Sequence, residues 1–304
     1  MQRVDYYVLT QILIDDLYFP HEEPHKNVLG GGCYTVAGMR VWSDYVGICS
    51  GVGPDFAGNY DAWFLRNGIQ VSGIPRSEKC THSRLNYFSD GEREELLLPG
   101  YGSHALMQPK VSEIPSEYDP CKGMYLFKDC EESFWNDMSL YLRRHPNMLS
   151  VWEILGATAA PENREKIAAC LDCVNLFSLN LTEGRRLSGE DNPAEILKFL
   201  FRMNAKTVIL RMGAKGALVS DGKHSYHIPA TPAKVVDVTG GGNSSTGGFL
   251  VGYAESGGDL VRAGVCASAA ASFIIEQVGL PPVQDHSMRA EAEKRAAALC
   301  VTAL

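Results

Sequence analysis

The clearest pattern in the chain is an alternation of short apolar runs and helix-like stretches that begins near Tyr125. The apolar runs predict buried strands, and the segments between them carry helical capping residues. This alternation predicts a mainly parallel sheet with right-handed crossovers. We predict strands at 149–154, 174–179 and 206–210, and helices at 161–170, from 181 to 187, and from Asn192-Pro193 onward.

The N-terminal part has shorter predicted strands. Residues 4–9 and 12–14 are apolar and β-branched, and they lead into Asp15 and Asp16. An acid at the carboxyl end of a strand in an α/β sheet faces the ligand crevice, although a solvated turn acid fits the same pattern. Residues 81–88 and 95–98 flank the turn signal Ser89-Asp90-Gly91-Glu92, which predicts a β-hairpin.

Composition narrows the class of protein. The chain has 304 residues, of which 45% are hydrophobic and 21% charged, which fits one large α/β domain with a small appendage. A net charge of −8 disfavours nucleic acid or an anionic membrane as partner. We expect no signal peptide. The nine scattered cysteines indicate reduced thiols and a cytoplasmic protein, and the apolar run 263–275 predicts a buried helix, too short to span a membrane.

A glycine turn has the strongest chemical signal. Gly240, Gly241 and Gly242 stand between a β-like run and a helix-like run that continues to about residue 255. Unpaired backbone N–H groups and the helix dipole at such a turn favour an anion such as phosphate. Asp237 and Thr239 offer oxygens for a monovalent cation or for fixing the turn, and Asn243 is predicted as the helix N-cap. The glycines alone fit a flexible loop equally well.

The residues around this turn resemble the Asp-x-Thr-Gly-x-Gly-Asp signature of the ribokinase/PfkB sugar and nucleoside kinases. The match holds at Asp237, Thr239, Gly240 and Gly242. It fails at Asn243, where the family has the aspartate that serves as catalytic base. An amide does not accept the proton. The resemblance therefore implies a divergent member whose catalytic centre contains Asn243 and the three glycines.

Looser matches imply a substrate site in the N-terminal part. Asp15 matches the family's aspartate that binds two substrate hydroxyls. Gly30, Gly31 and Ala37 match the motif Gly-Gly-x-x-x-Asn-x-Ala. Thr35 stands where that motif has the asparagine that contacts the sugar, which implies an altered substrate pocket.

Two further motifs imply a nucleotide site. Asn180 and Glu183 follow a predicted strand, and their spacing suits hydrated Mg²⁺ or an ordinary helix cap. The family has Asn-x-x-Glu here, which positions magnesium and the nucleotide phosphates, so Glu183 is an indirect Mg²⁺ contact. Gly213 and Gly216 match a family motif that contacts ATP, with Arg211 in place of its threonine. An arginine beside phosphate would serve as a planar charge donor.

The resemblance extends over nearly the whole chain. It implies a single domain over residues 1–304, with a ribokinase-like three-layer α/β sandwich, a mainly parallel central sheet and a small β lid from segments near 10–25 and 80–100. In the family the lid covers the substrate and often mediates dimers, so a homodimer through the lid is a further expectation.

Three functions fit these residues. The first is ATP- and Mg²⁺-dependent phosphotransfer to a hydroxyl of a small sugar- or nucleoside-like molecule. It would be slow because a general base is typically worth about 10²- to 10⁴-fold in rate. The second is a pseudokinase that binds nucleotide or metabolite as a sensor or partner. The third is an enzyme with other chemistry in the same pocket.

Overall fold

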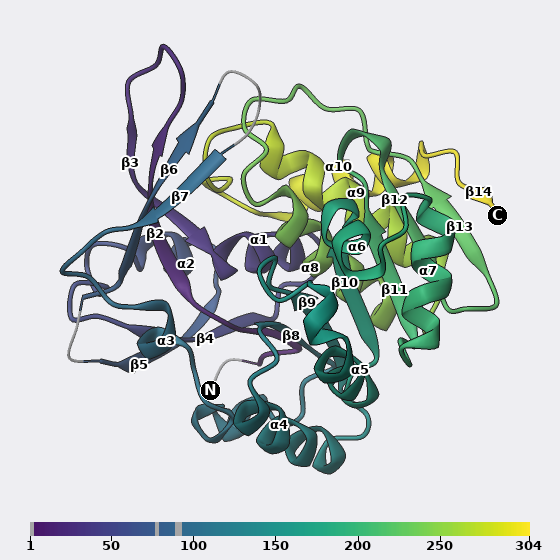
Figure 1. The fold of residues 1–304 in the computed structure, drawn as a ribbon. Coiled ribbons are helices and arrows are strands. Elements are labelled where there is room, and N and C mark those ends of the chain that lie inside the picture. The colour runs from purple at the N-terminus through teal and green to yellow at the C-terminus, as the bar shows by residue number, and fades with distance from the viewer. Residues whose placement is uncertain (1–2, 77–78, 89–92) are drawn as a thin grey trace.

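A ten-stranded sheet forms the centre of the computed structural model, which describes residues 3–76, 79–88 and 93–304 (Figure 1). Its order is β14-β13-β12-β11-β10-β9-β8-β1-β4-β5. The strands from β5 to β11 pair in parallel, and the other three form an antiparallel edge. The strands are β1 (Tyr6–Leu9), β4 (Val46–Val52), β5 (Gln70–Pro75), β8 (Gly123–Lys128), β9 (Leu149–Ile154), β10 (Leu176–Asn180), β11 (Thr207–Arg211), β12 (Ala217–Ser220), β13 (Ser225–Ile228) and β14 (Thr302–Ala303).

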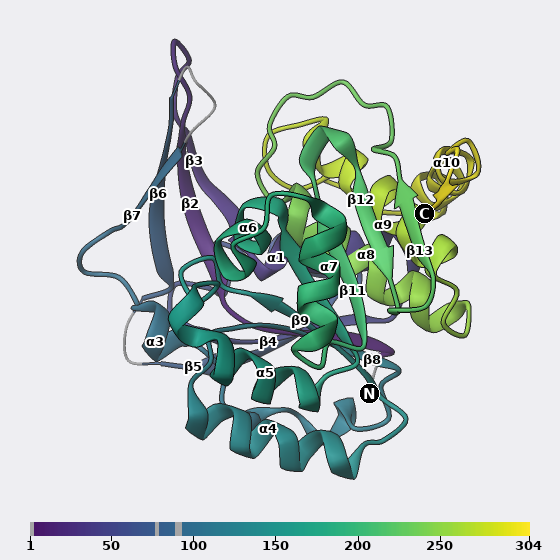
Figure 2. The same ribbon diagram turned by 45° about the vertical axis from the view of Figure 1, so that its right-hand side comes forward.

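Helices cover both faces of this sheet (Figure 2). They are α1 (Gly32–Trp42), α2 (Ala62–Arg66), α3 (His104–Met107), α4 (Glu132–Arg144), α5 (Arg164–Cys173), α6 (Leu181–Ser188), α7 (Pro193–Arg202), α8 (Gly241–Glu255), α9 (Leu260–Ile275) and α10 (His286–Ala297). In β1, Tyr6 and Val8 pack in one core with α1, α8 and α9, whereas Tyr7 and Leu9 pack in a second core with α4 and α5. Strands buried on both faces explain the continuous apolar runs in the sequence.

Local capping chemistry fixes several helix starts. The Asn192 side chain accepts a hydrogen bond from the Ala194 N–H at 2.9 Å, and α7 begins at Pro193 as predicted. The Asp259 side chain caps α9, which contains the predicted buried helix. Among the described residues, no helix has the length and apolarity needed to cross a bilayer.

A second, four-stranded sheet stands beside the main one (Figure 1). We call it the lid sheet; it consists of β2 (Ile12–Tyr18), β3 (His25–Gly31), β6 (Thr81–Tyr87) and β7 (Arg93–Leu97) in the order β3-β2-β6-β7. The predicted α/β architecture with a mainly parallel sheet and a small second β sheet is confirmed. The β6–β7 pair is antiparallel, as a hairpin requires, and its predicted turn at residues 89–92 lies outside the described residues.

Asp15 corrects the strand prediction. We expected a strand of the main sheet to end at Asp15, but β1 ends at Leu9 and β2 runs through to Tyr18. Asp15 is therefore in the middle of a lid strand, where it pairs with Ser83 of β6. Only Thr10 and Gln11 separate β1 from β2 in the sequence. The apolar pattern continues across both strands and therefore does not show that the chain changes sheet between them.

Helices α1 and α8 approach closely at two glycines. A Cβ atom on Gly247 would lie 2.4 Å from the Thr35 carbonyl oxygen, and one on Gly38 would lie 2.1 Å from that of Ser244. Side chains at these positions would push the helices apart. The close approach places the start of α1, including Tyr34, beside the start of α8.

Candidate active site

The glycine turn enters α8 through a left-handed residue. Gly240 has φ 75° and ψ −5°, and the helix begins at Gly241. Gly240 occupies the N-cap position, so the prediction that Asn243 is the N-cap is wrong. Asn243 is the third helical residue, and its side chain is directed away from the helix end toward Tyr125 and Glu153.

Asp237 holds the approach to this turn. Its Oδ1 accepts hydrogen bonds from the Thr239 N–H at 2.9 Å and the Thr239 hydroxyl at 2.6 Å. The Thr239 hydroxyl also contacts the Tyr87 hydroxyl of the lid sheet. Asp237 Oδ2 is buried and has no hydrogen-bond partner among the described residues. The motif thus ties the turn to the lid and leaves one carboxylate oxygen unpaired.

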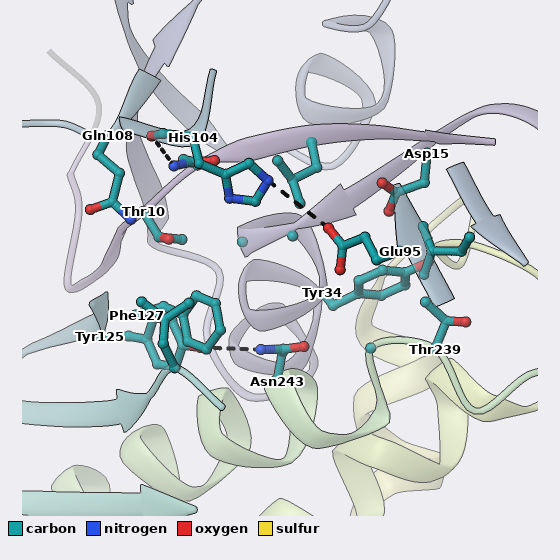
Figure 3. Close-up of a pocket in the computed structure, with 17 residues that line it drawn as sticks. Thr10, Asp15, Tyr34, Glu95, His104, Gln108, Tyr125, Phe127, Thr239 and Asn243 are labelled. Carbon is teal, nitrogen blue, oxygen red and sulfur yellow. Dashed lines mark hydrogen bonds and ion pairs between the residues drawn. The ribbon is translucent and has the colours of Figure 1, made fainter. Parts of the chain in front are cut away.

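A first cavity of about 130 Å³ lies between the lid sheet and the start of α8 (Figure 3). Asp15 and Asn243 lie on different sides of it in this view. The Asp15 carboxylate accepts a hydrogen bond from the Ser83 hydroxyl and lies against the backbone of Gly30. The lining residues are Thr10, Gln11, Leu13, Asp15, Gly31, Gly32, Tyr34, Leu85, Glu95, His104, Gln108, Tyr125, Phe127, Leu155, Thr239, Gly240 and Asn243.

Thr35 does not line this cavity. It is fully buried in α1, and the neighbouring Tyr34 lines the cavity instead. The Tyr34 hydroxyl is buried and has no hydrogen-bond partner among the described residues. Tyr34 therefore presents an aromatic ring where the sequence motif predicts Thr35 as a polar contact.

A second cavity of about 530 Å³ lies on the other side of the turn. Its polar part contains Asn180, Arg211, Gly241 and Gly242, and Gly213 and Gly216 also line it. The remainder is mostly apolar and includes Ala230, Val235, Val238, Ala267, Ala271 and Ile275. The glycine turn separates the two cavities, since Gly240 borders the first and Gly241 and Gly242 border the second.

Asn180 and Glu183 form a reciprocal cap on α6. The Asn180 side chain accepts from the Glu183 N–H at 2.8 Å, and Glu183 Oε2 accepts from the Asn180 N–H at 2.7 Å. Burial raises the pKa of the Glu183 carboxyl above its usual value, and the charge of Arg211 opposes that shift. The motif thus has a structural function at the edge of the second cavity.

A polar cluster joins the two cavities behind the turn. We call Tyr125, Glu153, Arg211 and Asn243 the buried cluster. Asn243 Nδ2 donates to the Tyr125 hydroxyl and to Glu153 Oε1, both at 3.3 Å. Tyr125 donates to Glu153 Oε2 at 3.0 Å, and Arg211 donates to Glu153 Oε1 at 2.8 Å. Glu153 is only 4% exposed, and burial raises the pKa of the Tyr125 hydroxyl well above its usual value.

Comparison with known sequences places the chain in a family. The model of the pfkB family carbohydrate kinases matches residues 20–285. The chain belongs to this family. It is 34% identical over 256 residues to the nucleoside kinase of Methanocaldococcus jannaschii, covering 82% of this chain and 80% of that protein. It is 26% identical to the cytidine kinase of Thermococcus kodakarensis, covering 83% and 89%.

The solved structures agree with the family at the level of the fold. The ribokinase of Arabidopsis thaliana, complexed with ribose and ATP, superposes with a TM-score of 0.77 at 20% identity, covering 97% of this chain and 99% of that one. The ribokinase-like fold predicted from the sequence is confirmed.

In this pfkB-family chain, most of the predicted site residues gather around the two cavities. Asp15, Gly31, Gly240 and Asn243 border the first, and Gly30 lies just behind Asp15. Their roles stay predictions. Sequence reasoning assigned no chemistry to Tyr125 or Glu153. A lone acid inside the apolar run 149–154 was the available signal, since a charge in a buried strand needs a partner.

Proposed function

We propose that this chain transfers the γ-phosphoryl group of ATP to a hydroxyl of a small sugar- or nucleoside-like molecule. The observation that carries the proposal is the pair of cavities on opposite sides of the glycine turn at the start of α8. The hydroxyl compound occupies the first cavity and ATP the second. The names of the relatives, which are nucleoside, cytidine and ribose kinases, support this substrate class.

The phosphate side uses backbone and arginine donors. The first N–H groups of α8 and the helix dipole favour the charge that moves during phosphoryl transfer. Arg211 lines the same cavity, and its buried Nε has no hydrogen-bond partner among the described residues, which leaves a donor for phosphate. Gly213 and Gly216 let the nucleotide approach the backbone, while Asp237 and Thr239 hold the turn.

The hydroxyl compound is held from the lid side. Asp15 is 3% exposed and borders the first cavity, so its carboxylate accepts hydrogen bonds from substrate hydroxyls. Gly30 and Gly31 leave room for that carboxylate and for the ligand. Tyr34 lines the cavity in place of Thr35, so its ring packs against the substrate.

Magnesium fits the second cavity as a hydrated ion. Asn180 lines this cavity and its N–H holds Glu183 Oε2, so the pair would bind waters of a Mg²⁺ ion that arrives with ATP. Mg²⁺ commonly keeps several waters and uses few protein carboxylates. This agrees with the described residues, which contain no group of three or more His, Cys, Asp or Glu placed to hold a metal. Such an ion neutralises phosphate charge. A monovalent cation at Asp237 Oδ2 is a further proposal.

Asn243 favours one alternative. Its amide is not a base, so the same cavities would also suit a pseudokinase that binds ATP without transferring phosphate. The buried cluster around Asn243 is intact and links the two cavities, which favours transfer.

The test is ADP formation from Mg-ATP with ribose, cytidine and adenosine, alongside ATP binding by calorimetry. Formation of a phosphate ester supports the kinase. ATP binding without ADP formation supports the pseudokinase, and absence of ATP binding overturns both. Lys198→Gln on the exposed side of α7 is the control variant, because Lys198 pairs with Glu195 and does not appear among the residues that line the two cavities.

A further inference from the structure

Asn243 lines the first cavity with a side chain whose orientation is set by its neighbours. Its Nδ2 is directed toward the Tyr125 hydroxyl and Glu153, as Figure 3 shows for the contact with Tyr125. Its Oδ1 has no hydrogen-bond partner among the described residues. An amide oxygen accepts a hydrogen bond from a hydroxyl and orients it, but it does not take the proton. Proton transfer requires another group.

Glu153 is the carboxylate next to Asn243. It is absent from the residues that line the first cavity, so a ligand held there would not touch it directly. Tyr125 lies between them, since its ring lines the cavity and its hydroxyl donates to Glu153 Oε2 at 3.0 Å. A hydroxyl has one donor and two acceptor positions. The donor is used toward Glu153, and the acceptor positions of the hydroxyl face Asn243 and Thr35. Tyr125 is fully buried, so a ligand hydroxyl held by Asn243 would reach the Tyr125 oxygen by replacing one of these two contacts.

We infer that Glu153 is the general base of this site and that it acts through Tyr125; this inference rests on the proposed phosphotransfer. The ligand oxygen attacks the γ-phosphorus as the bond from phosphorus to the leaving ADP oxygen breaks. The ligand hydroxyl proton passes to the Tyr125 oxygen while the Tyr125 proton passes to Glu153 Oε2. The products are the phosphate ester, ADP and a protonated Glu153, which later returns its proton to water through Tyr125.

The two oxygens of Glu153 have separate roles in this scheme. Oε1 accepts from Arg211 at 2.8 Å and from Asn243 at 3.3 Å, so it is fixed in place. Oε2 faces Tyr125. The ion pair with Arg211 offsets the cost of a buried charge. Phosphoryl transfer depends mainly on positioning and charge stabilisation, which limits what the base must supply.

A purely structural ion pair between Glu153 and Arg211 is the competing explanation. The base and the structural explanations are distinguished by moving the carboxylate from Glu153 to position 243. Asn243→Asp combined with Glu153→Gln leaves the net charge of the buried cluster unchanged but places the carboxylate in the first cavity, where it touches the ligand directly. Asn243→Asp alone sets two carboxylates about 3.3 Å apart, at the position of the present contact.

The experiment measures single-turnover ADP formation with whichever of ribose, cytidine and adenosine the wild type phosphorylates, and ATP affinity by calorimetry. Glu153→Gln and Tyr125→Phe should each slow turnover by roughly 10²- to 10⁴-fold, as for loss of a general base, and should leave ATP affinity within threefold. The doubly substituted Asn243→Asp/Glu153→Gln protein should be at least tenfold faster than Glu153→Gln. In that background Tyr125→Phe should have no further effect, because the new carboxylate needs no relay.

Each outcome bears on a distinct claim. Absence of wild-type turnover with all three compounds overturns the proposed function, and the inference that rests on it. If the wild type turns over but the rate of Glu153→Gln or of Tyr125→Phe lies within threefold of the wild-type rate, the relay is overturned and the proposed function stands. Failure of the doubly substituted protein to exceed Glu153→Gln, with melting temperature retained, assigns Glu153 to structure.

Discussion

Gly240→Ala would test how the turn at the start of α8 is held. Gly240 has φ 75°, and an added Cβ would lie 2.0 Å from Cγ of the Tyr34 ring. A left-handed backbone costs a residue other than glycine about 1–2 kcal/mol. An added Cβ so close must displace the ring or the turn, and such overpacking costs about 1–3 kcal/mol. We therefore expect a loss of about 2–5 kcal/mol in the free energy of unfolding.

The matching shift in melting temperature follows from chain length. An unfolding entropy of roughly 2.1 cal/mol/K per residue gives about 0.64 kcal/mol/K for 304 residues. The expected loss lowers the melting temperature by about 3–8 °C. Thermal unfolding followed by circular dichroism measures it, with ATP affinity as a second readout that should also fall.

Gly241→Ala is the matched control one residue along. Among the described residues, Gly241 is not one of the glycines with positive φ, and an added Cβ would meet only Ile275 at 3.0 Å. Alanine gains about 0.5–1 kcal/mol over glycine inside a helix, which offsets that contact. Its melting temperature should stay within about 2 °C of the wild type. If Gly240→Ala melted like Gly241→Ala, the described packing of the turn would be wrong.

Three further predictions concern single side chains. Asp15→Asn should raise KM for the hydroxyl compound at least tenfold without changing ATP affinity. Asp16→Asn, on the same strand but paired with Lys26 at 2.8 Å, should leave both unchanged. Equal KM values for the Asp15→Asn and Asp16→Asn proteins would refute the role of Asp15. Arg211→Gln should cost about 3–5 kcal/mol in urea unfolding because Glu153 becomes a buried charge without a cation; adding Glu153→Gln should recover most of the loss, and no recovery would contradict the pairing. Burial lowers the pKa of His82 below 6.5, so the unfolded chain binds the proton first, and stability should fall as the pH drops from 6.5 through the lower folded-state pKa. In His82→Gln, the free energy of unfolding measured with urea should lose this pH dependence. An unchanged pH dependence would assign it to another group.

The sequence predicted those parts of the fold that local chemistry determines. The strand at 149–154 and the helix from Pro193 have strong local signals, because a buried parallel strand is continuously apolar and a proline suits only the first turn of a helix. The glycine turn was predicted from local chemistry in the same way, and α8 does begin at Gly241 directly after Gly240.

The predictions failed where contacts between distant segments determine the sheet that a strand joins or the residue at which a helix begins. Asp15 was assigned to the end of a main-sheet strand because apolar patterning does not show which sheet a strand joins. Asn243 was predicted as N-cap because asparagine favours that position, but Gly240 in a left-handed conformation begins the helix instead. Glu153 and Tyr125 meet Asn243 only after three distant segments pack together, and no spacing in the sequence encodes that meeting.

The position of β1 in the sheet also determines when the protein can fold during its synthesis. β1 precedes the other described strands in the sequence, yet it lies between β4 and β8 in the sheet. Tyr6 pairs with Val46 on one side and with Gly123 on the other. The apolar residues Tyr6–Leu9 therefore gain one partner once β4 has been translated, but they wait for the second until β8 has been translated. Such non-local pairing slows folding and exposes the nascent strand to chaperones.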